Sequence, residues 1–158
     1  MQPMSHQDWK NHVLRRMIAW IEERFACEVY WLEQTGSPNG FVEYRNGKHI
    51  IYLLADPECN DLATLIDILA HEAGHVRYNQ EWMAAGRTYS EIVHRTRVKL
   101  AAFDQLLSQG IITDEEYDRL YAAIEEEWQS NQASEEIAGQ LWQIAKAGHV
   151  EKSSESCI

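Results

Sequence analysis

The pentapeptide at positions 71–75, His-Glu-Ala-Gly-His, is the part of the chain whose residue types and spacing indicate a chemistry. Two histidines four positions apart on a helix lie about 40° apart around its axis, so both rings can reach one metal ion. Imidazole nitrogens are ligands that Zn²⁺ prefers, and zinc lowers the pKa of a bound water enough for a carboxylate to deprotonate it. The spacing therefore predicts that His71 and His75 bind Zn²⁺ and that Glu72 acts as the general base in hydrolysis of a carbonyl compound.

Two histidines do not complete such a site, because a catalytic zinc usually has three protein ligands and one open position. The extended pattern HExxHxxGxxH is absent, since Tyr78 and Glu81 occupy the positions of its glycine and third histidine. A glutamate on a later helix is the alternative. On a helix expected from about 130 to 147, neither Glu135 nor Glu136 is central to the apolar stripe, but Glu135 is nearer the buried face. Glu91 lies sixteen residues after His75. Three further alternatives stay open: Glu136, His94 and no third protein ligand.

The helix that carries the motif is expected over residues 60–78. Apolar residues recur at intervals of three and four before the motif, at Leu62, Leu65, Ile66 and Leu69. Asn60 or Asp61 is a suitable N-cap after Pro57. The motif would therefore lie near the end of a largely buried helix, where surrounding side chains can shield a metal ion.

A helix and three strands are expected before the motif. Residues 6–25 have the apolar periodicity of an amphipathic helix. Three runs have the composition of strands, 28–33, 41–45 and 48–55, and Asn46-Gly47 between the last two is a strong hairpin signal. We expect a small, mainly antiparallel sheet. The strand at 48–55 is either a plain core strand or the rim of a cleft, where its free edge would pair with an extended peptide.

The C-terminal half is expected to be helical. Helices are predicted over about 89–109, 113–129 and 130–147, with a capping box opening at Thr113. Residues 88–129 would form an inserted helical hairpin, 1–150 a single domain and 151–158 a flexible tail. We interpret the acidic run 125–127, and the basic residues Arg95, Arg97 and Lys99, as solvated helix faces. The order of elements indicates an α+β fold.

Composition narrows the possible partners. The 158 residues carry a formal net charge of −11, which disfavours binding to nucleic acid. No segment approaches the apolar length of a membrane span, and three cysteines without regular spacing do not indicate a disulfide framework. We expect a cytoplasmic protein, away from membranes, whose oligomeric state the sequence leaves open.

The motif helix after a short sheet, followed by Glu135-x-x-Ala138 and hydrophobic residues, resembles the ImmA/IrrE-type zinc metallopeptidases. The resemblance covers residues 28–78 and 131–145. It implies a zincin-like fold, zinc bound by His71, His75 and Glu135, and Glu72 as the catalytic residue. The chain departs from the family in the longer gap between His75 and Glu135 and in Gly139, where the family prefers Asn or Asp.

The resemblance implies a zinc-dependent metallopeptidase that hydrolyses a peptide bond in a protein or peptide substrate. Among the tyrosines at 44, 52, 78 and 89, Tyr89 is favoured as a donor to the oxyanion because it flanks the expected cleft. The alternative function is a non-catalytic module that keeps the fold and binds a protein partner, for example a phage or mobile-element regulator.

Overall fold

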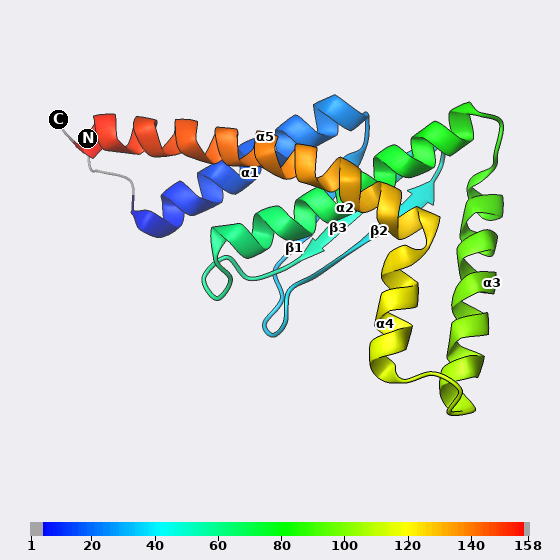
Figure 1. Cartoon of the computed structure of the whole chain (residues 1–158). Coiled ribbons are helices and arrows are strands. Elements are labelled where there is room, and N and C mark those ends of the chain that lie inside the picture. The colour runs from blue at the N-terminus through cyan, green and yellow to red at the C-terminus, as the bar shows by residue number, and fades with distance from the viewer. Residues whose placement is uncertain (1–4, 157–158) are drawn as a thin grey trace.

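Five helices and three strands make up residues 5–156, which are the part of the chain that the computed structural model describes, with side chains described as far as Gly148. The class is α+β and mostly helical, as predicted (Figure 1). In chain order the elements are α1 (His6–Phe25), β1 (Glu28–Leu32), β2 (Asn39–Arg45), β3 (Lys48–Leu54), α2 (Leu62–Ala84), α3 (Tyr89–Ser108), α4 (Asp114–Ala123) and α5 (Glu125–Ser156).

The sheet is mixed, in the order β1-β3-β2, so the prediction of a mainly antiparallel sheet is wrong for one of its two pairings. The Asn46-Gly47 hairpin pairs β2 and β3 antiparallel as predicted, whereas β1 runs parallel to β3. The central place of β3 follows from its composition, because Ile50, Ile51 and Leu53 are all buried and a central strand is shielded best. Both edges of β3 are therefore paired, which confirms the core-strand alternative and excludes the free edge, and β1 and β2 each have one free edge.

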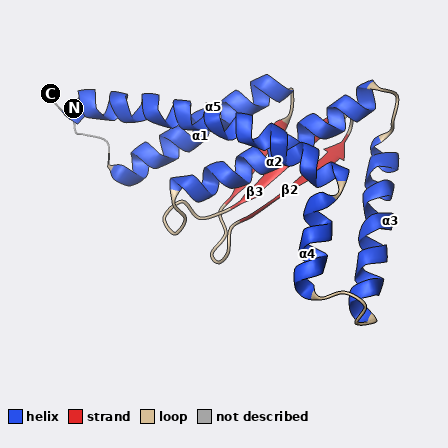
Figure 2. Ribbon diagram, viewed as in Figure 1, coloured by secondary structure: helices blue, strands red, loops and turns tan. Residues whose placement is uncertain are grey.

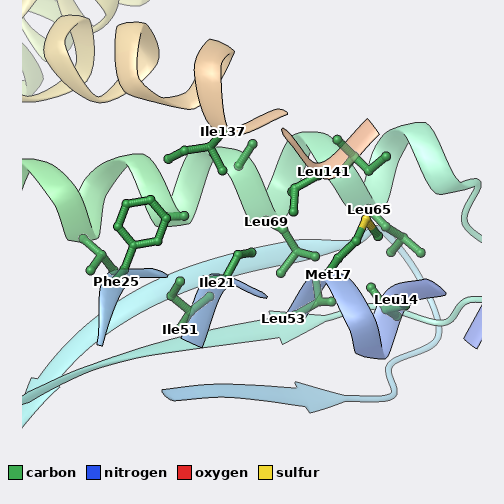
Figure 3. Close-up of a cluster of buried hydrophobic side chains, with 14 of the residues drawn as sticks. Leu14, Met17, Ile21, Phe25, Ile51, Leu53, Leu65, Leu69, Ile137 and Leu141 are labelled. Atoms are coloured by element: carbon green, nitrogen blue, oxygen red, sulfur yellow. The ribbon is translucent and has the colours of Figure 1, made fainter. Parts of the chain in front are cut away.

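Helices α1 and α2 pack on one face of the sheet, and α5 covers them on the side away from it (Figure 2). The core continues through these layers, from Leu141 of α5 through Leu65 and Leu69 of α2 to Leu53 of β3 (Figure 3). Helices α3 and α4 lie side by side and extend away from these layers (Figure 1). They add little to the core, since Ile92 is the one buried residue in α3 and α4 has none.

Side-chain caps define where the helices begin. Asp61, one of the two predicted caps of the motif helix, accepts a hydrogen bond from the Thr64 amide. Thr113 accepts one from the Glu116 amide, as the predicted capping box requires. Before α2, the Lys10 ammonium group of α1 donates to carbonyl groups in the loop at 57–60. This contact ties the start of the motif helix to α1.

The break between the last two helices comes at Ile124, earlier than the predicted position near 130. Ile124 has an extended backbone and is only 7% exposed, so its buried side chain anchors the corner. Helix α5 then continues to Ser156. The predicted tail at 151–158 thus lies partly within α5, and its last two residues lie outside the described residues. None of the described helices is both long and apolar enough to cross a membrane.

Candidate metal centre

Three side chains converge at the motif: His71 and His75 of α2 and Glu127 of α5. The two histidine Nε2 atoms lie 3.2 Å apart. One carboxylate oxygen of Glu127 lies 3.4 Å from Nε2 of His75, and the other lies 3.9 Å from Nε2 of His71. Ligand bonds of 2.0–2.2 Å around a tetrahedral zinc separate the ligand atoms by about 3.3–3.6 Å. The three side chains therefore need only small rotations to bind one ion.

The charge of Glu127 also fits a bound cation. Its carboxylate is buried, and it has no lysine or arginine partner among the described residues. The two preceding glutamates differ, because Glu125 pairs with Arg95 at 2.8 Å and Glu126 pairs with Lys99 at 2.9 Å. A buried carboxylate without a compensating charge is costly. A divalent ion between Glu127 and the two imidazoles would supply that charge.

Gly74, inside the motif, allows α5 to reach this position. A Cβ added to Gly74 would lie 2.4 Å from the carbonyl oxygen of Ser130, so only glycine lets the two helices approach this closely. Ser130 is fully buried, and its hydroxyl lies 3.1 Å from Nδ1 of His75. Glu127 precedes Ser130 by one helical turn, so the close approach at Gly74 directs both side chains toward His75.

Helix α5 also carries Glu135, the predicted third ligand, but Glu135 is not part of this cluster. It lies eight residues beyond Glu127, about 12 Å along the helix, and its side chain is exposed. Two of the alternatives form ion pairs elsewhere, Glu136 with Arg77 and Glu91 with Arg87. The remaining alternative, His94, is exposed and lies outside the cluster as well.

The acidic run at 125–127 was the available signal for the third ligand. Acidic residues are favoured in the first turn of a helix, and α5 begins with these three. The interpretation of the run as a solvated face is wrong for Glu126 and Glu127, which are 4% and 7% exposed. The same interpretation of the basic residues is wrong for Lys99, because its ammonium group binds the buried carboxylate of Glu126.

Glu72, the predicted base, is buried beside the cluster. Burial raises the pKa of its carboxyl group to about 6, with a smaller lowering by His71 and a further increase from Glu127. Strand β2 packs directly against it, because a Cβ on Gly40 would lie 2.9 Å from Cγ of Glu72. Burial also lowers the pKa of His75, although Glu127 opposes this effect, and so favours the neutral imidazole that a metal requires.

The cluster lines a cleft of about 760 Å³ between β2, α2 and the α3–α4 pair. Of the four tyrosines considered as oxyanion donors, the favoured Tyr89 and also Tyr78 line this cleft, and Tyr44 and Tyr52 do not. Sequence reasoning missed Tyr121, which also lines the cleft and donates a hydrogen bond to Oε1 of Glu127 at 3.1 Å. Burial, together with Glu127, raises the pKa of its phenol to about 12.

Comparison of the chain with protein-family models, with curated proteins and with solved structures finds no match. The resemblance to the ImmA/IrrE-type metallopeptidases therefore stays a prediction from the motif.

Proposed function

We propose that the protein is a zinc-dependent metallopeptidase whose ion is bound by His71, His75 and Glu127. The observation that carries this proposal is the buried carboxylate of Glu127, whose oxygens lie 3.4 and 3.9 Å from Nε2 of His75 and His71 and which has no lysine or arginine partner among the described residues. A zincin-like fold and the resemblance to the ImmA/IrrE-type family belong to the same proposal. In it, Glu127 takes the role that the resemblance assigned to Glu135.

The chemistry requires a base next to the metal ion. Bound zinc would polarise the substrate carbonyl and lower the pKa of a water. Glu72 accepts the proton of that water and later passes it to the leaving amine. In the metal-free protein the pKa of about 6 leaves the Glu72 carboxylate mostly ionised at neutral pH and able to accept a proton, and the charge of a bound ion would favour the ionised form further.

The free edge of β2 offers a place for an extended peptide. Residues 38–42 line the cleft opposite the motif helix, and β2 pairs with β3 on one side only. The backbone amide of Gly40 donates to Oδ1 of Asn39 at 2.8 Å, an acceptor that a substrate carbonyl can replace. A substrate chain paired there would extend the sheet and pass beside Glu72.

A non-catalytic module that binds a protein partner is the second candidate. Its support comes from the α3–α4 pair, where Val98 and Ile111 are 55% and 62% exposed. Both residues lie on a part of the chain that adds little to the core, so a partner could contact them without disturbing the fold.

Glu72→Gln tests the proposal, because it removes the base and keeps the size of the side chain. We expect this variant to retain zinc and fold but to cleave a proteome-derived peptide library about 10²–10⁴-fold more slowly than the wild type. Glu135→Gln is the matched control and should keep wild-type cleavage. Equal activity of Glu72→Gln and wild type would refute the hydrolase. Zinc binding by a wild type that cleaves no peptide would favour the second candidate.

A further inference from the structure

Tyr121 is the one described residue whose side chain donates a hydrogen bond to Glu127. Its hydroxyl lies 3.1 Å from Oε1, and this is the same oxygen that lies 3.4 Å from Nε2 of His75. Tyr121 belongs to the last turn of α4, whereas Glu127 belongs to the first turn of α5. The contact therefore spans the corner formed by Ile124.

We propose that Tyr121 is a positioning residue that holds the carboxylate of Glu127 in the orientation needed to bind the metal ion. This inference rests on the proposed metal centre. A glutamate side chain has several rotatable bonds, and fixing them costs conformational entropy. A phenol that already restrains one carboxylate oxygen lowers this cost at the moment of metal binding. Partners of this kind behind a metal ligand commonly tune metal affinity.

Helix α4 packs beside helix α3. The hydroxyl of Tyr117, one turn earlier in α4, donates to Asp104 of α3 at 2.9 Å, and its ring packs edge-on against Phe103. Helix α3 also binds the first turn of α5, through the ion pairs of Arg95 with Glu125 and of Lys99 with Glu126. The α3–α4 pair thus restrains all three glutamates of the acidic turn, and Tyr121 restrains the one that faces the metal.

Two phenylalanine substitutions in α4 separate this role from general stability. Tyr121→Phe removes the hydroxyl that contacts Glu127. Tyr117→Phe removes the hydroxyl that contacts Asp104, which is its one hydrogen-bond partner among the described residues, and keeps the ring that packs against Phe103 and holds α4 beside α3. Zinc affinity would be measured by competition with a chelating dye, and the absorption bands of bound Co²⁺ would report the coordination geometry. We expect Tyr121→Phe to weaken zinc binding about tenfold and to alter the cobalt bands. The zinc affinity of Tyr117→Phe should stay within about twofold of the wild type, because the hydroxyl that it loses contacts Asp104 and not Glu127.

Reciprocal coupling gives a second readout. If the Tyr121 contact links α4 to the metal centre, zinc should slow amide hydrogen exchange in α4 of the wild type and not in Tyr121→Phe. Wild-type zinc affinity in Tyr121→Phe, together with loss of zinc in Glu127→Gln, would overturn the role of Tyr121 and leave the metal centre standing. Equal weakening by both phenylalanine variants would also overturn it. Wild-type affinity in Glu127→Gln would instead refute the metal centre.

Discussion

Gly74→Ala should separate helix α5 from helix α2 at the metal centre. The added Cβ would lie 2.4 Å from the carbonyl oxygen of Ser130. That is about 1 Å closer than an ordinary van der Waals contact. Neither atom can rotate away, because both are fixed by the helical backbone. We expect α5 to shift outward by a large part of this distance and to carry Glu127 and Ser130 away from His75.

The loss of stability in Gly74→Ala can be estimated with Gly139→Ala as the reference variant. Replacing glycine by alanine in a helix contributes about 1 kcal/mol of stability, and overpacking costs about 1–3 kcal/mol. A Cβ on Gly139, which lies in α5 and not in α2, would meet nothing within 4 Å, so Gly139→Ala should show only the gain. The free energies of unfolding of the two variants should thus differ by about 1–3 kcal/mol, the cost of overpacking alone.

Urea denaturation of the metal-free proteins measures this difference, and dye competition measures zinc affinity. Gly74→Ala should bind zinc 10–100-fold more weakly, the order of magnitude found when support of a ligand is lost, and Gly139→Ala should bind it as the wild type does. Equal stability of the two variants, with unchanged zinc affinity in Gly74→Ala, would show that the helices do not approach as closely as described.

Two further predictions concern single side chains. Ser130→Ala should weaken zinc binding about tenfold, because it removes the partner of Nδ1 of His75. Ser134→Ala, one turn further along α5, should not, and a similar loss in both would refute the role of Ser130. His49 is buried and its Nε2 has no partner among the described residues, so burial lowers its pKa from 6.5. Below about pH 6.5 the unfolded chain takes up a proton that folded His49 refuses, so metal-free stability should fall with a slope of at most about 1.4 kcal/mol per pH unit. His49→Leu should reduce this loss of stability between about pH 7 and 5.5, measured by urea denaturation. An unchanged loss would show that His49 is not its source.

The start of the motif helix and its cap could be predicted from the sequence because they depend on neighbouring residues, whereas its end lies at Ala84, beyond the predicted 78, so the motif is not near the end of the helix. Apolar spacing at three and four placed the buried face of α2, and Asp61 was one of two predicted caps. The Asn46-Gly47 turn likewise predicted the pairing of β2 with β3. The pairing of β1 with β3 could not be predicted from neighbouring residues, because it depends on which of the three strands is apolar enough to be central.

The third side chain of the metal centre could not be predicted from spacing within the motif. It depends on where α5 crosses α2, and that crossing is fixed by the small size of Gly74 and by the corner at Ile124. The resemblance favours Glu135, on the same helix. The three acidic residues at 125–127 did carry a signal, because they are typical of a helix start. A helix that begins at 125 has Glu127 in its first turn.

Anomalous diffraction at the zinc absorption edge, from crystals of the wild-type protein grown with Zn²⁺, tests the metal centre most directly. We predict one strong anomalous peak, which marks a zinc ion bonded to Nε2 of His71, Nε2 of His75 and a carboxylate oxygen of Glu127 at distances of about 2.0–2.2 Å. A peak bonded to Glu135 instead of Glu127, or no peak at the two histidines, would contradict this centre.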